Sequence, residues 1–264
     1  MTTPPADLLP LAVDIAREAG ALAYARRRAG VSIAATKSAV ADIVTDADRE
    51  VETLIRQRLD AARPGDGFLG EESGGGESTT GITWVVDPID GTVNYAFGIP
   101  IYAVSIAAVA GEPVPREWTA LVGVVYNPVT DELFHAVRGE GAWLGEQRLA
   151  VTREAPAGAL LATGFGYDPA THAGDLARVA KVMPIARDLR RMGSASLDLA
   201  SVAAGRLDGY FERGLNPWDH AAGALLVEEA GGRVGGIGGG PVGRAMTIAA
   251  GPAVFERLVS IITE

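Results

Sequence analysis

The chain has no cysteine among its 264 residues. This absence excludes disulfides, a thiolate nucleophile and metal sites built on cysteine. The three histidines lack the spacing of a histidine-based zinc site, and the sequence shows no Ser-His-Asp order. Apolar runs are too short to span a bilayer, and residues 1–20 lack the basic and apolar regions of a signal peptide. We therefore expect a cytoplasmic protein.

Basic residues are fewer than acidic residues in this chain. The 23 lysines and arginines are outnumbered by 33 aspartates and glutamates, which gives a formal net charge of −10. This balance argues against binding to nucleic acid or to an anionic membrane, so we expect neither as a partner. An anionic substrate is still possible, because bound cations can reverse the local field. With 48% hydrophobic residues, the chain can bury a full core.

Apolar periodicity predicts an α/β architecture. Helical spacing marks residues 7–28 and 46–62, and short β-branched runs then predict a largely antiparallel sheet. The second half alternates strands and helices, and no linker separates the halves, so helices should cover sheets in layers. We expect one catalytic unit over residues 1–264, with approximate halves 1–150 and 151–264. The expected later strands are 82–86, 103–109, 121–126, 132–137, 160–163, 189–192, 210–211 and 246–249, and the expected later helices are 169–183, 194–204, 218–230 and 253–262.

The glycine-rich segment 231–240 could be mistaken for a phosphate-binding loop. A nucleotide fingerprint needs a helix that opens directly after its glycines, and here a strand pattern follows. We therefore expect a mobile surface connection.

Acidic residues gather at three element ends. Asp87 and Asp90 end an apolar run in WVVDPIDGTVNY, Glu71-Glu72 follow another, and Asp219 begins a helical pattern in NPWDHAAG. Carboxylates this close raise each other's pKa, and a hard divalent cation removes that penalty by taking their oxygens as ligands. Alone, Asp90 could be a turn residue and Asp219 a helix-start residue. Together the three clusters predict one metal site built from distant segments.

These motifs resemble the inositol monophosphatase family of metal-dependent, lithium-sensitive phosphatases. The resemblance covers nearly the whole chain and is strongest to the inositol-phosphatase branch. The matching segments are GEES (70–73), WVVDPIDGTVNY (84–95), RRMGSA (190–195), DGYFERG (208–214) and WDHAAG (218–223), with Lys37-Ser38 and DIVT (42–45) before Asp48.

The resemblance implies a layered αβαβα sandwich, a homodimer, and two or three Mg²⁺ ions per site. It implies direct attack of a metal-activated water on inositol monophosphate, which releases inositol and phosphate, and inhibition by lithium. By match, the metal ligands are Glu71, Asp87, Asp90, Asp219 and the carbonyl of Ile89. The implied catalytic residues are Glu71 and Thr92, with Asp48 supporting Thr92. The implied substrate-binding residues are Asp90, Gly91, Thr92, Ser194, Ala195, Glu212 and Asp219.

Several assignments stay open on the sequence. Glu72 could support the site or be a solvated charge, and Lys37 could tune a weaker metal position or be a loop residue. Arg190-Arg191 fits a surface pair better than a substrate clamp, and His220 fits packing better than a place at the pocket rim. Alternative substrates are fructose 1,6-bisphosphate, phosphoadenosine phosphate, NADP and histidinol phosphate. The alternative of another class is a non-enzymatic regulatory module.

Overall fold

The structure, a computed structural model, describes residues 4–30, 33–36, 43–112, 114 and 117–263. Lys37, Ser38 and Asp42 lie outside the described residues. In chain order the elements are η1 (Pro5–Leu8), α1 (Leu9–Ala29), β1 (Ile33–Thr36), β2 (Ile43–Thr45), α2 (Asp46–Ala62), β3 (Gly67–Gly70), β4 (Gly74–Gly76), β5 (Ile82–Asp90), α3 (Thr92–Phe97), β6 (Ala103–Gly111), β7 (Trp118–Asn127), β8 (Glu132–Val137), β9 (Gly141–Leu144), β10 (Gln147–Arg148), β11 (Ala159–Thr163), α4 (Pro169–Val182), η2 (Met183–Ile185), β12 (Ala186–Arg190), α5 (Ala195–Ala203), β13 (Gly209–Glu212), α6 (Pro217–Glu229), β14 (Arg233–Gly235), η3 (Ile237–Gly239), β15 (Thr247–Ala250) and α7 (Pro252–Ile261).

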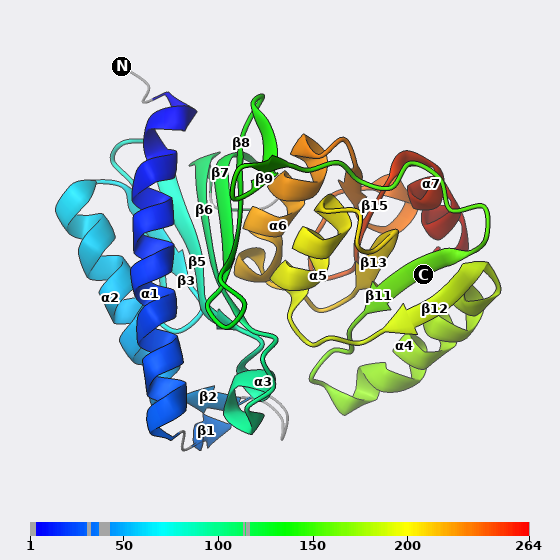
Figure 1. Cartoon of the computed structure of the whole chain (residues 1–264), viewed down its shortest axis with the longest axis horizontal. Helices are drawn as coiled ribbons and strands as arrows, with labels where there is room; N and C mark the ends of the chain where they lie inside the picture. The colour runs from blue at the N-terminus through cyan, green and yellow to red at the C-terminus, as the bar shows by residue number, and fades with distance from the viewer. Residues whose placement is uncertain (1–3, 31–32, 37–42, 113, 115–116, 264) are drawn as a thin grey trace.

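Five layers alternate across the molecule (Figure 1). Helices α1 and α2 cover one face of an eight-stranded sheet, and α5 and α6 fill the space between this sheet and a five-stranded one. Helices α4 and α7 cover the far face of the smaller sheet. The expected layered αβαβα sandwich is therefore confirmed.

The larger sheet has the order β10-β9-β8-β7-β6-β5-β3-β4, and β3–β5 is its one parallel pair. The expected, largely antiparallel character of this sheet is thus confirmed. The smaller sheet has the order β12-β11-β13-β15-β14, with parallel pairs on both sides of β11. β12 begins three residues earlier than the strand expected at 189–192.

The glycine-rich segment is not simply a connection, so that expectation was wrong. Residues Arg233–Gly235 form β14, which pairs with β15 at the edge of the smaller sheet. Main-chain pairing needs no side chain, and Val234 still packs against the apolar core. The residues that follow, 236–240, four of which are glycines, close a tight turn that contains η3.

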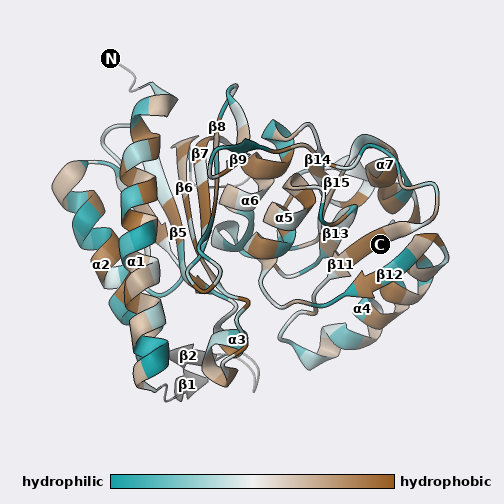
Figure 2. Ribbon diagram, viewed as in Figure 1, coloured by the Kyte–Doolittle hydropathy of each residue, from teal (hydrophilic) through white to brown (hydrophobic). Residues whose placement is uncertain are grey.

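Three apolar clusters fill the spaces between the five layers, and one of them lies on both sides of α5 and α6. Along β5, Trp84 and Val86 pack toward α1 and α2, whereas Val85 packs toward α5 and α6. Because both faces of this strand are covered, its sequence is a continuous apolar run rather than an alternating one. Figure 2 shows the same pattern, with apolar strands inside and mixed colouring along the outer helices α1 and α2.

Helix α6 is packed on almost every side. His220, Ala221, Ala222 and most of the next turn are buried between the two sheets. The backbone approach is close at Gly123 of β7, where a Cβ atom would lie 2.8 Å from the carbonyl oxygen of Ala222. Both sheets therefore fix the position of α6, and with it the position of Asp219 in its first turn.

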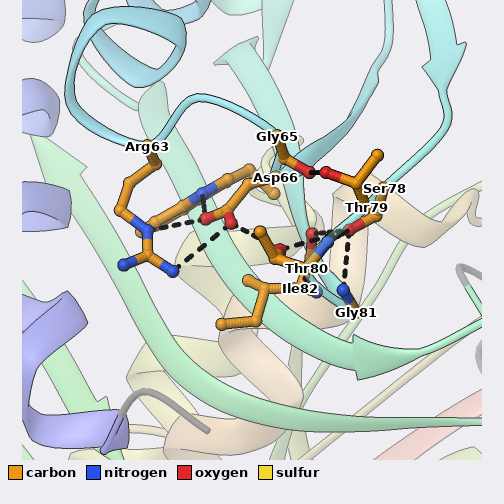
Figure 3. A network of polar contacts seen from close by, with 9 residues as sticks. Arg63, Gly65, Asp66, Ser78, Thr79, Thr80, Gly81 and Ile82 are labelled. Atoms are coloured by element: carbon orange, nitrogen blue, oxygen red, sulfur yellow. Dashed lines mark hydrogen bonds and ion pairs between the residues drawn. The ribbon is translucent and has the colours of Figure 1, made fainter. Parts of the chain in front are cut away.

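A buried carboxylate ties together the amino-terminal ends of β3 and β5 (Figure 3). Asp66, whose side chain is 2% exposed, accepts hydrogen bonds from Arg63 Nε at 2.9 Å, Thr80 Oγ1 at 2.6 Å and Trp84 Nε1 at 3.0 Å. Thr79 adds a main-chain bond to the Gly65 carbonyl at 2.8 Å. This network holds the two strands at the end opposite to Glu71 and Asp87.

We predict that Asp66→Ala lowers the free energy of unfolding by about 3 kcal/mol, because three donors lose a buried acceptor. Urea unfolding followed by circular dichroism measures this loss. The control is Glu256→Ala, which breaks an exposed ion pair with Arg233 and should barely shift the midpoint. Equal midpoints for Asp66→Ala and the wild type would contradict the assignment.

Candidate active site

Parallel pairing of β3 and β5 brings the first two acidic clusters together. The carboxyl ends of the two strands lie at the same edge of the sheet, with Gly70 opposite Val86. The Glu71 amide donates to the Val86 carbonyl at 3.2 Å, so Glu71 and Asp87 follow neighbouring strand positions. The short apolar run before each carboxylate is what forms these strands.

A bulge then turns Asp87 and Asp90 toward the same space. In the pairing of β5 with β6, Asp87 lies opposite Ser105 and Asp90 opposite Ala103, so β5 contains one extra residue. Residues three apart on a regular strand point to opposite faces, and the extra residue cancels this alternation. Both side chains are buried, at 2% and 7% exposure, yet both line one cavity.

Gly91 and Thr92 follow at the start of α3. Gly91 has φ +95°, and a Cβ atom there would lie 2.9 Å from the Ile101 carbonyl oxygen, so only glycine fits without displacing the chain. The Thr92 hydroxyl is within hydrogen-bonding distance of Asp48 Oδ1, at 3.2 Å, and of the Ile89 carbonyl, at 3.1 Å. Asp48 is 1% exposed in the first turn of α2, behind Thr92.

The smaller sheet and the middle helices supply the opposite wall. Glu212 ends β13 and Asp219 lies in the first turn of α6, while Ser194 and Ala195 begin α5. Asp219 Oδ2 accepts the Asn216 amide at 2.7 Å and so forms part of the capping box of α6. Each of these side chains stands at the end of an element that packs against the central core.

Asp90 links the two walls. Its Oδ2 accepts bonds from Ser194 Oγ and from the Ser196 amide, both at 2.7 Å, at the amino terminus of α5. Sequence reasoning missed Ser196, although its place one residue after the matched Ser-Ala pair was a usable signal. Asp90 thus bridges strand β5 and helix α5.

One cavity of about 1120 Å³ collects the predicted residues. Of the predicted site residues, only Asp48 does not line it. Those on its wall are Glu71, Asp87, Ile89, Asp90, Gly91, Thr92, Ser194, Ala195, Glu212 and Asp219. The rim adds Tyr167, Arg191, Arg213 and Arg244, of which the sequence singled out only Arg191.

Glu72, Arg190 and His220 all lie away from the cavity wall. Glu72 does not line the cavity, and its amide donates to Glu52 Oε2 at 2.8 Å. Arg190 pairs with Asp188 on the exposed strand β12. His220 is buried with its ring centroid 6.2 Å from that of Trp118, and burial lowers its pKa to about 4.

The electrostatics of the cavity call for positive charge. Burial, and then the neighbouring Glu71 carboxylate, raise the pKa of Asp87 and of Asp219 well above the usual aspartate value. Every candidate ligand atom is an oxygen, the donor type that hard cations such as Mg²⁺ and Ca²⁺ take. The donor set therefore fits a hard divalent cation.

The carboxylates face the cavity without yet surrounding a point in it. Among the described residues, no three acidic or histidine side chains stand close enough together to hold a cation. Asp90 and Asp219 already accept main-chain hydrogen bonds at the amino termini of α5 and α6. Binding would use their remaining lone pairs.

Glu212 has an environment of its own. The buried Tyr210 hydroxyl donates to Glu212 Oε2 at 2.6 Å, and Glu212 lines the cavity. Burial raises the pKa of Glu212 to about 7, while the Tyr210 bond opposes that rise. Glu212 therefore changes charge near neutral pH.

Comparison with known proteins identifies the family. A model of the inositol monophosphatase family matches residues 5–263. Inositol-1-monophosphatase SuhB of Mycobacterium tuberculosis is 42% identical over 98% of this chain and 96% of its own length. Nus factor SuhB of Escherichia coli is 42% identical over 88% of this chain and 86% of its own length. The crystal structure of extragenic suppressor protein SuhB from Bartonella henselae superposes with a TM-score of 0.89 at 36% identity, covering 98% of this chain and 99% of that one.

The chain belongs to the inositol monophosphatase family. This membership makes the protein a phosphoric monoester hydrolase of a metal-dependent family. Within the described residues, no helix has the length and apolarity needed to cross a membrane.

We predict that Glu212 titrates near pH 7 in the folded protein and that Tyr210→Phe moves this pKa higher, because the variant loses the bond that favours the charged form. Carboxyl ¹³C chemical shifts followed against pH, assigned with Glu212→Gln, measure both values. Since the folded state holds this proton more tightly than the unfolded state, the Glu212 contribution to stability should fall as pH rises from 4.5 to about 7 and then stay constant. A midpoint near 4.5 in the folded protein would contradict this account.

Proposed function

We propose that the protein hydrolyses inositol monophosphate to inositol and phosphate in an Mg²⁺-dependent reaction. The observation that carries this proposal is the meeting of Glu71, Asp87, Asp90 and Asp219, from three separate segments, on the wall of one cavity. Residues 1–264 would act as a single catalytic unit, since the approximate halves 1–150 and 151–264 each supply part of this wall.

Two or three Mg²⁺ ions would be held by those four carboxylates and the Ile89 carbonyl. When bound, such ions lower the pKa of an attacking water and neutralise charge on the phosphate. The raised pKa values of Asp87 and Asp219 support this assignment, because a cation would remove the cost of two ionised, buried carboxylates.

Three residues would orient the attacking water. The Thr92 hydroxyl donates a hydrogen bond to Asp48, and the lone pairs of the Thr92 oxygen can then accept a hydrogen bond from water. Glu71, on the same side of the cavity, would be the general base that receives the second water proton. Substitution of a positioned base of this kind typically costs a factor of about 10²–10⁴ in rate.

The substrate would lie between the two walls. The free amides of Gly91 and Thr92 at the start of α3 would bind the phosphate. Across the cavity, Ser194, Ala195 and the Glu212 carboxylate would contact the polyol. Asp90 and Asp219 would border both groups, since they line the same cavity as the α3 turn and Glu212.

The remaining expectations stay predictions. A homodimer, a cytoplasmic location, and the absence of nucleic-acid and membrane partners follow from the sequence and the family resemblance. The Escherichia coli relative is named a Nus factor, so a regulatory role is a second candidate for this chain. The complete set of carboxylates favours the enzyme, because a pure binding module would have no use for four like charges in a buried cavity.

We predict that exhaustive chelation abolishes phosphatase activity, that Mg²⁺ restores it, and that Li⁺ inhibits it. Asp219→Asn should raise the Mg²⁺ concentration needed for half-maximal activity, because it removes one charged ligand. Phosphate release measured against Mg²⁺ tests each point. The matched control, Glu228→Gln near the other end of α6, removes only a surface pair with Arg138 and should behave as wild type. Undiminished turnover in metal-free protein would overturn the proposed function.

The size and rim of the cavity favour a second class of substrate. A volume of about 1120 Å³ exceeds the range of about 300–1,000 Å³ usual for small-molecule sites. Arg213 and Arg244 line the cavity at its rim. Their segments lie side by side, because the amide of Gly214, the residue after Arg213, donates to the Arg244 carbonyl at 2.8 Å. Two cations beside a phosphate site suit an ester with a second anionic group, such as fructose 1,6-bisphosphate, phosphoadenosine phosphate or NADP.

We predict that Glu212→Ala harms hydrolysis of inositol monophosphate more than that of an aryl phosphate, which has no hydroxyl to donate. The specific loss should be about 1–3 kcal/mol, as for a partner left unpaired. Values of kcat/KM for both esters, and for fructose 1,6-bisphosphate, phosphoadenosine phosphate, NADP and histidinol phosphate, measure it. Arg213→Ala and Arg244→Ala should weaken turnover of the doubly anionic esters only. Equal loss on the inositol and aryl esters would remove Glu212 from the polyol site.

A further inference from the structure

Glu52 is a buried carboxylate that does not line the cavity. It lies in the second turn of α2 and is 3% exposed. A carboxylate is costly to bury without hydrogen-bond partners, so its position needs a reason. Its partner is the Glu72 amide, which donates to Glu52 Oε2 at 2.8 Å.

The hydrogen bond places Glu52 beneath the turn that carries Glu71. This turn follows β3 and includes the sequence Gly70-Glu71-Glu72-Ser73. Gly70 allows the close approach, because a Cβ atom at that position would overlap the Glu52 carboxylate. A glycine before Glu71 is thus explained by contact with helix α2.

Glu52 is the middle member of a row on one face of α2. Asp48, Glu52 and Arg56 are spaced four residues apart, and such residues share one face of a helix. Asp48 accepts the Thr92 hydroxyl at 3.2 Å, and Arg56 Nη1 donates to Ser73 Oγ at 3.1 Å. The row therefore contacts both segments that carry the proposed water-orienting residues, Thr92 and Glu71.

We propose that Glu52 is a positioning residue that holds the 70–73 turn so that the Glu71 carboxylate faces the cavity. Through Asp48 and Glu52, helix α2 then sets the distance between Thr92 and Glu71. Glu52 acts here as a hydrogen-bond acceptor for a main-chain amide, and its negative charge is not what the turn requires. This inference rests on the proposed function only where turnover is the measurement.

Two conservative substitutions distinguish the hydrogen-bond acceptor function of Glu52 from its negative charge. Glu52→Gln keeps the length of the side chain and an oxygen that can accept the Glu72 amide. Glu52→Asp keeps the charge and shortens the side chain by one methylene, so its oxygen falls short of that amide. The control, Glu50→Ala, lies on the same helix, and its exposed carboxylate contacts only Arg26 among the described residues.

The first measurement is hydrogen exchange of the Glu72 amide by NMR in metal-free protein. Exchange should accelerate at least about tenfold in Glu52→Asp and stay near wild type in Glu52→Gln and Glu50→Ala, as expected when one protecting bond is lost. The second is Mg²⁺ affinity by calorimetry, which should weaken about 10–100-fold in Glu52→Asp alone, as for other residues that orient metal ligands. The third is kcat for inositol monophosphate, which should fall with the affinity.

The outcomes distinguish the two proposals. If Glu52→Gln is as damaged as Glu52→Asp, or more so, the charge matters and the positioning role is overturned. If the Glu72 amide exchanges faster in Glu52→Asp while Mg²⁺ affinity and kcat keep their wild-type values, the bond is structural and the role is again overturned. If the wild type binds Mg²⁺ but hydrolyses none of the esters, the proposed function fails, while exchange and affinity still test Glu52.

Discussion

The repulsion among buried carboxylates is the constraint on which the architecture of this protein depends. Asp87 and Asp219 are held where burial and like charge both raise their pKa, so nothing in their own chemistry keeps them together. The backbone does so instead. A parallel strand pair, one bulge and a helix packed between two sheets each fix one carboxylate, and three apolar cores supply the stabilisation that opposes the repulsion.

Much of this arrangement could be predicted from the sequence, and the remainder has identifiable causes. Helical periodicity predicted both ends of α2 correctly, and the family motifs named ten residues that line one cavity. The bulge that aligns Asp87 with Asp90 could not be predicted, because it depends on the register with β6. Edge strand β14 was missed because glycine-rich composition hides a ladder made only by the main chain. Glu52 was missed because its partner is a backbone amide, which leaves no trace in residue identity.

Two of the acidic residues serve the fold and the proposed chemistry at once. Asp90 and Asp219 accept main-chain hydrogen bonds at the amino termini of α5 and α6, where the helix dipole favours negative charge. These bonds partly offset the repulsion before any cation arrives. A substitution at either position therefore weakens a helix start as well as the site, so lost activity there should be interpreted together with a measurement of stability.

The position of α6 between the sheets also has a consequence during synthesis. The larger sheet is complete by residue 148, but one of its faces is covered only when residues 195–229 have left the ribosome. Until then, Ala107, Val125 and their neighbours on that face would meet water or a chaperone. The nascent chain would reach its last aspartate of the cavity, Asp219, at about the same time. Closure of the hydrophobic interior and completion of the acidic cavity wall would thus both fall late in synthesis and close together.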